Sequence, residues 1–260
     1  MWPAVGLCWG TIRQASLLEL IDVAGMHRFP TLSVPPHIVD LCLATGGTAA
    51  NLRRRLAEAQ VRVTVIDALT RDLPGAPSPE EVPPIWRRNW TYGLDDLIRM
   101  AEALEAPTIN VTHFRGKPVE PHVMAEAIAA LAERAARHGL NLSLEFMPGT
   151  SMATLASSAR IVELSGAPNV GLMLDTWHLL RAGDDANGIR QLPPESLAGI
   201  QLNDRRTDAT EPAQGEVSSR SRRSSRKAGS PTTTPTWRVH RPRRPGVPSR
   251  PRANVSRRWS

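Results

Sequence analysis

Apolar residues follow two periods along this chain, one of two residues that is typical of strands and one of about 3.6 residues that is typical of helices. The first pattern predicts strands at residues 4–9, 31–34, 61–69, 108–114, 141–145, 170–175 and 197–204. The second predicts helical segments at residues 16–24, 36–44, 49–60, 94–104, 121–139 and 151–164. Proline at the start of the 121–139 segment and glycine at its end are the residues that favour a helix start and a helix stop.

Strands and helices alternate over seven units, which predicts a parallel sheet, because parallel strands need a crossover connection. The 260 residues are the usual length of a (β/α)8 barrel, and this length and count favour a closed barrel over an open doubly wound sheet. The predicted fold class is therefore an α/β protein, a (β/α)8-type TIM barrel. Its eighth β/α unit is missing from the pattern, because residues 205–260 occupy that place with a different composition.

Residues 205–260 contain no Leu, Ile, Met or Phe and are dominated by Arg, Ser, Pro and Thr. They hold 15 of the 32 Lys and Arg residues and 3 of the 25 Asp and Glu residues, so they carry +12 while residues 1–204 carry −5. Such a segment cannot bury enough apolar surface to offset its ordering entropy, and we expect a barrel domain at 1–204 and a disordered tail at 205–260. The tail is either an arm that binds nucleic acid through its arginines or an out-of-frame translation of a GC-rich gene.

The two cysteines, Cys8 and Cys42, lack the spacing of a metal site and provide no disulfide framework, which fits a reducing compartment. No signal-peptide pattern and no apolar window long enough to span a bilayer is found. We therefore expect a cytoplasmic protein with no membrane partner. The sequence leaves the oligomeric state open.

Two of the predicted strands end on a carboxylate, Glu145 and Asp175. An acidic residue in an otherwise apolar strand is costly unless it is paired or binds a metal. The two positions are 30 residues apart, which leaves room for one crossover helix, so both strand ends meet on the face where parallel barrels carry their chemistry. The strand ends therefore predict a site, with metal ligation favoured over a structural salt bridge.

With these residues in view, the chain resembles the xylose isomerase-like barrel family, which includes sugar phosphate isomerases and epimerases, inosose dehydratases and, more remotely, endonuclease IV. The resemblance covers residues 4–206 and rests on the Leu-Glu145 strand end, the Leu-Asp-Thr-Trp-His turn at 174–178 and the Ile-Gln-Leu-Asn-Asp strand at 200–204. It implies that Glu145, Asp175 and Gln201 bind a divalent metal. The resemblance also implies a fourth ligand, a glutamate on an eighth strand, for which this chain has no candidate.

Two carboxylates and an amide oxygen favour Mn²⁺ or Mg²⁺, with Co²⁺ or Zn²⁺ less favoured. A divalent ion that bridges the carbonyl and hydroxyl oxygens of an α-hydroxy ketone acidifies the carbon between them, and a carboxylate can then move the proton. The resemblance makes Glu145 both a ligand and a catalytic base. It also implies that His178 binds an oxygen atom of the substrate.

Each further candidate has a structural alternative. His178 either acts in the site or caps the strand, and Gln201 is either a metal contact or a hydrogen-bonding filler. His113 and Trp9, at the ends of two other predicted strands, either line the substrate pocket or are packed or solvent-facing. For a substrate-binding arginine beyond the seventh strand, Arg205, Arg206 or neither corresponds.

The leading hypothesis is a metal-dependent isomerase or epimerase that acts on a sugar, a sugar phosphate or a related hydroxy-carbonyl compound. An inosose-type dehydratase is the second hypothesis, and the presence of Gln201 favours it slightly. A third hypothesis is a truncated, inactive barrel with a basic tail that binds nucleic acid, since the glutamate of the eighth strand is absent. Apurinic-site endonuclease activity is disfavoured, because a three-metal site needs more ligands than the seven scattered histidines offer.

Overall fold

The computed structural model describes residues 5–84, 86–184 and 186–203. The predicted tail at 205–260 and the candidate Arg205 lie outside these residues. Seven parallel strands form one sheet in the order β1-β2-β3-β4-β5-β6-β7. The strands are β1 (Leu7–Cys8), β2 (Thr31–Val34), β3 (Arg62–Leu69), β4 (Thr108–Thr112), β5 (Asn141–Glu145), β6 (Val170–Asp175) and β7 (Leu197–Gln201).

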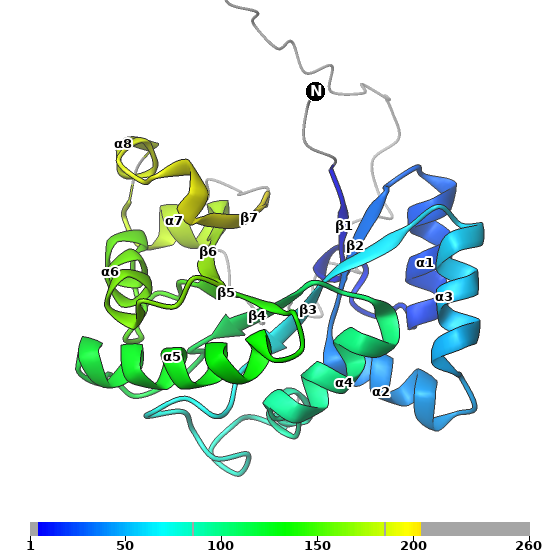
Figure 1. Cartoon of the computed structure of the whole chain (residues 1–260), viewed down its shortest axis with the longest axis horizontal. Coiled ribbons are helices and arrows are strands. Elements are labelled where there is room, and N and C mark those ends of the chain that lie inside the picture. The colour runs from blue at the N-terminus through cyan, green and yellow to red at the C-terminus, as the bar shows by residue number, and fades with distance from the viewer. Residues whose placement is uncertain (1–4, 85, 185, 204–260) are drawn as a thin grey trace, which may run out of the picture. The chain divides into compact units, whose positions relative to one another are not determined.

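The crossover helices lie along the outside of the sheet, which curls into part of a barrel (Figure 1). They are α1 (Leu17–Met26), α2 (Pro36–Ala44), α3 (Ala49–Glu58), α4 (Leu94–Leu104), α5 (Pro121–Ala136) and α6 (Leu155–Ser165), with short helices α7 (Thr176–Arg181) and α8 (Ala186–Arg190) after β6. Three 3₁₀ helices complete the described elements: η1 (Trp9–Ile12), η2 (Arg87–Trp90) and η3 (Pro194–Ser196). The predicted barrel class and the parallel alternation are confirmed.

Local sequence explains most helix boundaries. Ser16 and Glu19 form a capping box at the start of α1, and Thr154 and Ser157 form one at the start of α6. The polar residues of the 151–154 segment form a turn and the cap, so α6 begins later than the periodicity predicts. Trp9 likewise begins η1 instead of ending a strand, because β1 is only two residues long.

The apolar core lies between the sheet and its helices and is supplied by alternate residues of β2 to β6, among them Leu32, Ile66, Ile109, Leu142 and Leu172. Polar residues on the same strands face the other side of the sheet, into the concave interior. Asn110 pairs in register with Ser143, and Thr112 pairs with Glu145. The interior therefore carries a layer of polar side chains at the carboxyl ends of the strands.

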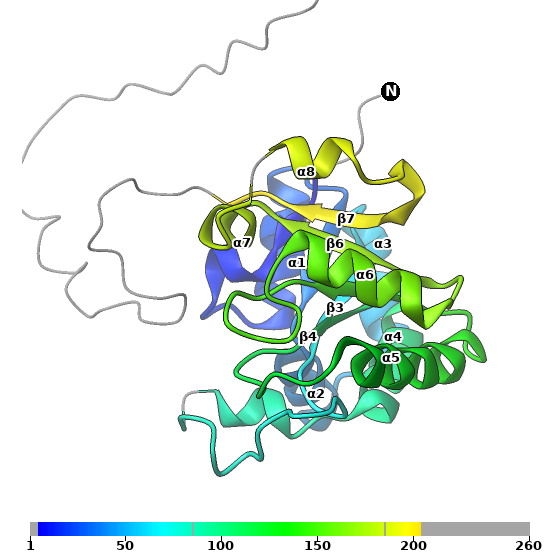
Figure 2. The same cartoon turned by 90° about the vertical axis from the view of Figure 1, so that its left-hand side faces the viewer.

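The two outer strands of this sheet have no further partner among the described residues. β7 lies at one edge, beside β6 and with α8 above it in the view of Figure 2, and β1 lies at the other. On β7 and just after it, Ile200 is 59% exposed and Leu202 is 76% exposed. A parallel barrel closes by pairing its first and last strands, so an eighth strand would be placed at these edges.

Candidate metal centre and active site

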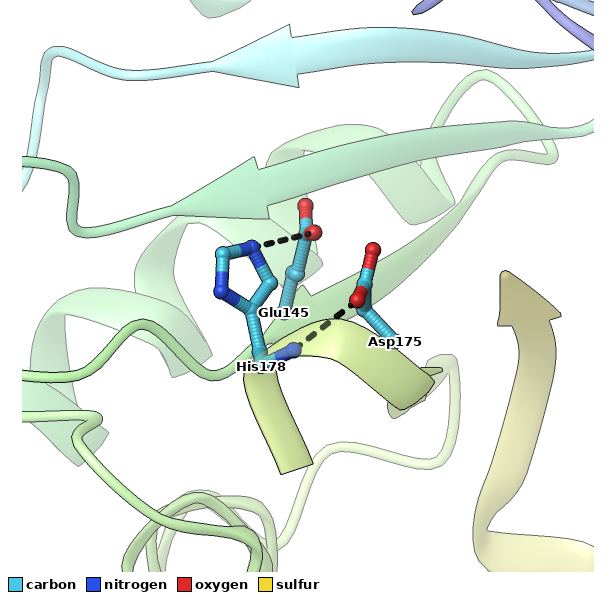
Figure 3. Close-up of side chains that lie close together, drawn as sticks. All are labelled: Glu145, Asp175 and His178. Atoms are coloured by element: carbon cyan, nitrogen blue, oxygen red, sulfur yellow. Dashed lines mark hydrogen bonds and ion pairs between the residues drawn. The ribbon is translucent and has the colours of Figure 1, made fainter. Parts of the chain in front are cut away.

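Glu145, Asp175 and His178 come together at the carboxyl ends of β5 and β6 (Figure 3). Each offers one ligand atom, and these atoms all lie within 4.8 Å of one another. Nε2 of His178 is 3.3 Å from Oε1 of Glu145. The three residues are almost fully buried, at 6%, 1% and 1% exposure respectively.

Asp175 builds the turn that places His178. Its Oδ1 accepts hydrogen bonds from the backbone amides of Trp177 and His178 at 2.7 and 3.0 Å, so Asp175 is the N-cap of α7. Its Oδ2 accepts a hydrogen bond from the Asn203 side chain at 2.6 Å. A carboxylate at an N-cap is favoured because it satisfies free backbone donors at the positive end of the helix. The strand end and the first turn of α7 therefore form one unit.

A network that the sequence analysis did not predict continues from Glu145 across the interior. Nδ2 of Asn110 donates to Oε2 of Glu145 at 2.7 Å and to Oδ1 of Asp67 at 2.8 Å. Oγ of Ser143 donates to Oδ1 of Asn110 at 2.9 Å. Asp67 and Asn110 are both buried. The sequence did contain a signal for including Asp67 in the site. It is an acidic residue within the otherwise apolar strand 61–69, just as Glu145 and Asp175 are in their strands.

Trp9 and Gln201 reach the same network from the two edges of the sheet. Nε1 of Trp9 donates to Oδ2 of Asp67 at 2.9 Å. Gln201 pairs in register with Asp175, and its side chain acts to lower the pKa of Asp67. Both residues therefore face the interior. Both act here on a carboxylate of the protein, and their substrate and metal roles stay predictions.

His113 lies apart from this group. Thr112, in register with Glu145, is the last residue of β4, so His113 lies in the loop that follows this strand. Nδ1 of His113 accepts a hydrogen bond from the backbone amide of Ser151 at 3.4 Å, and burial lowers the pKa of this imidazole. His113 therefore packs against the loops that follow β4 and β5, and its role in lining a substrate pocket stays a prediction.

This packing gives a stability prediction for Gly116, which follows β4. A Cβ atom at Gly116 would lie 1.9 Å from Nε2 of His113, so Gly116→Ala should lower the unfolding free energy by about 1–3 kcal/mol, the usual cost of overpacking. Gly10→Ala, where the nearest atom is 3.6 Å from the added Cβ, is the control. Urea titrations of both variants, and of Gly116→Ala combined with His113→Ala, measure the effect. A Gly116→Ala variant as stable as Gly10→Ala would contradict this packing.

The buried carboxylates carry the electrostatic signature of a site. Burial raises the pKa of Glu145, and the charge of Asp67 adds to this increase, while the His178 imidazole, 3.3 Å away, opposes it. Burial also raises the pKa of Asp67, against the hydrogen bonds from Asn110 and Trp9 and the effect of the Gln201 side chain. Like charges held together out of water need either protons or a cation. A functional site is one environment in which such an arrangement occurs.

The donor set fits a divalent cation. Neither ring nitrogen of His178 has a hydrogen-bond partner among the described residues, although both are buried. Two carboxylates and an imidazole within 4.8 Å of one another can ligate Mn²⁺, Co²⁺ or Zn²⁺, and the amide oxygen of Gln201 is the type of ligand that suits Mn²⁺ and Mg²⁺. The structure places His178 beside the two carboxylates, whereas the sequence analysis assigned it the role of binding a substrate oxygen.

The fold is that of an α/β barrel with a candidate metal centre at its strand ends, and comparison with known proteins identifies the family. The model of the xylose isomerase-like TIM barrel family matches residues 37–227. The chain belongs to this family, as its sequence indicated.

Three known proteins illustrate the likeness. A 3-dehydroshikimate dehydratase of Pseudomonas aeruginosa is 35% identical over 86 residues, which are 33% of this chain and only 14% of that protein. The IolI protein with a bound zinc atom has a TM-score of 0.63 at 15% identity, covering 77% of this chain and 73% of that one. D-psicose 3-epimerase has a TM-score of 0.59 at 19% identity, covering 80% of this chain and 76% of that one.

These likenesses have different weight. At such low identities the two solved structures show a shared fold, and a shared barrel does not by itself imply a shared reaction. The family includes enzymes that epimerise sugars and enzymes that remove water. In the described part of this chain, no helix is long and apolar enough to cross a membrane.

Proposed function

We propose that this protein is a metal-dependent enzyme that removes a proton from the carbon next to a carbonyl group of a polyhydroxylated, sugar-like substrate, and that the reaction completed is loss of water. The observation that carries the proposal is the buried pair of Glu145 and His178, 3.3 Å apart beside Asp175. Loss of water needs one base and one acid, which is what this pair offers. The sequence match to a dehydratase supports the same reaction.

Glu145 takes the proton from the α-carbon, and the electrons of that C–H bond form an enolate. The enolate then expels the hydroxyl group from the β-carbon as a C=C bond forms, and His178 donates the proton with which this hydroxyl leaves as water. Transfer of the proton from Glu145 to His178 over 3.3 Å restores the starting state. Burial raises the pKa of Glu145, which makes its carboxylate a stronger base than one in water.

Glu145 and Asp175, with Gln201 beside them, would hold the cation and leave His178 as the proton donor, and Mn²⁺ or Mg²⁺ is the ion that the oxygen ligands favour. When bound, the cation supplies charge stabilisation for the developing enolate oxygen. Asp175, fixed by three hydrogen-bond donors, keeps this ligand set in place before substrate arrives. Action on a small molecule in the cytoplasm is part of this proposal.

Isomerisation or epimerisation, the leading hypothesis from sequence, is the second candidate. It starts with the same proton removal, and epimerisation needs a second acid–base group to return the proton on the other face. Asp67 is the observation in its favour, because it places a second buried carboxyl group in the same interior, joined to Glu145 through Asn110. Asp67 is fully enclosed by donors from the protein, which makes it a poorer proton donor than His178.

The two reactions are separated by incubating the full chain with Mn²⁺ in deuterated water and following the products by NMR and mass spectrometry. The substrates are 3-dehydroshikimate, an inosose, D-psicose and D-fructose, with the enzyme at high concentration so that slow turnover is detected. We expect a product lighter by one water, formed with Mn²⁺ and abolished in Glu145→Gln. Deuterium incorporation into a ketose with no loss of water would replace this proposal by the second candidate.

A further inference from the structure

Asp67, near the end of β3, is surrounded by hydrogen-bond donors from three separated parts of the sheet. Trp9 follows β1 and donates to Oδ2 at 2.9 Å, and Asn110 on β4 donates to Oδ1 at 2.8 Å. The side chain of Gln201 on β7 also favours the charged form of Asp67 and lowers its pKa. All three donors are neutral, so they orient this buried carboxylate without cancelling its charge.

The carboxylate in turn determines how the two amide side chains are oriented. Asn110 has its oxygen bound by Ser143 and its nitrogen shared between Asp67 and Glu145. A charged Asp67 attracts the nitrogen end of the Gln201 amide and lets the amide oxygen turn toward the strand position in register with Asp175. If Asp67 lost its charge, either amide could turn around, because an amide is nearly symmetric in shape.

We infer that Asp67 is a positioning residue of the cation site, which holds the Gln201 amide with its oxygen toward the ion and, through Asn110, the Glu145 carboxylate toward His178. This inference rests on the metal centre proposed above and adds a residue that the ligand set does not contain. Partners that hold metal ligands in place are generally worth ten- to a hundredfold in metal affinity.

A purely structural role and a positioning role make opposite predictions for the protein without metal. The charge of Asp67 acts on Glu145, and that of Asp175 acts on Asp67, so the three carboxylates repel one another when no cation is present. Asp67→Asn removes one of these charges and keeps the size of the side chain. A positioning residue therefore gives a variant whose metal-free form is at least as stable, while its affinity for the cation falls.

The experiment uses the full chain and measures Mn²⁺ binding by electron paramagnetic resonance and calorimetry, and the melting temperature in EDTA. We expect Asp67→Asn to bind Mn²⁺ about 10- to 100-fold more weakly and to melt in EDTA no lower than the wild type. Asp72→Asn is the matched control, since Asp72 lies in the loop after β3, where its side chain accepts a hydrogen bond from the backbone amide of Leu94. It should leave Mn²⁺ affinity unchanged.

Whether Asp67 acts through Gln201 is tested by a double-mutant cycle. If it does, Asp67→Asn should cost at least about threefold less affinity in a Gln201→Ala background than in the wild type, because contacting residues give non-additive effects. Should Asp67→Asn not fold, Asp67→Ser repeats both measurements with a smaller polar side chain.

Several outcomes would overturn the inference: unchanged Mn²⁺ affinity in Asp67→Asn, fully additive losses in the cycle, or a lower melting temperature in EDTA with no loss of affinity. The failure of the proposed function is distinguishable from these results. A wild-type chain whose Mn²⁺ binding is absent, or insensitive to Glu145→Gln, refutes the metal centre itself. A wild type that binds Mn²⁺ at Glu145 while Asp67→Asn binds equally well refutes only the role of Asp67.

Discussion

Glu145→Gln is expected to weaken Mn²⁺ binding by at least about a hundredfold and to lower the rate of α-proton removal by about 10³-fold or more. The substitution keeps the shape of the side chain, so Asn110 and His178 keep a neighbour of the same size. It removes one of the two anionic ligands and the proposed base at once. Titration calorimetry with Mn²⁺ and proton exchange in deuterated water, followed by NMR, measure the two effects.

Glu133→Gln is the control for this result. Glu133 lies on α5, where its carboxylate is exposed and pairs with Arg137, and its substitution should change neither quantity. Asp175→Asn is a second test of the same centre, in which an asparagine keeps the ability to cap α7. If both Glu145→Gln and Asp175→Asn bind Mn²⁺ as the wild type does, these strand ends are not a metal site.

The second large effect is expected from replacing residues 205–260 by an in-frame strand and amphipathic helix that carries a strand-end glutamate. Such a unit would pair with β7 and cover Ile200 and Leu202, whose burial is worth roughly 2–4 kcal/mol in all. For a domain of this size we expect the melting temperature to rise by roughly 6–12 °C. The added glutamate should raise the rate of α-proton exchange by about 10²–10⁴-fold, because it supplies both a ligand and a proton-transfer group.

A version of the added unit with glutamine at the strand end separates the two contributions. It should restore the melting temperature but not the exchange rate. A chain of the original sequence that already melts as high and exchanges protons as fast as the extended one would show that residues 205–260 supply what the added unit was designed to provide.

The alternation of strand and helix was enough to predict the barrel class, because each of the seven units is a local pattern of apolar residues followed by turn residues. The meeting of Glu145, Asp175 and His178 was also predictable. Two of these residues end adjacent strands, and the third follows one helical turn later. Parallel neighbours place such positions on one edge without any long-range information.

The partners of these residues were harder to predict. The bridge from Asp67 through Asn110 to Glu145 depends on the register of β3, β4 and β5, which the sequence pattern does not specify to a single residue. The surroundings of His113 were also hard to predict. The predicted strand ran on to 114, whereas β4 ends at Thr112, so His113 lies beyond the strand and its contacts depend on the loops after β4 and β5.

The cap that Asp175 makes on α7 has a consequence for how position 175 can change. The residue must be short enough to reach the amides of Trp177 and His178 and must also leave a carboxylate oxygen for a cation. Glutamate would satisfy the second demand and lose the first, while serine or threonine would do the reverse. Substitution at this position is thus restricted by two independent requirements. A substitution that keeps the cap would remove the carboxylate that the cation needs. A substitution that keeps the carboxylate would destabilise the turn that positions His178.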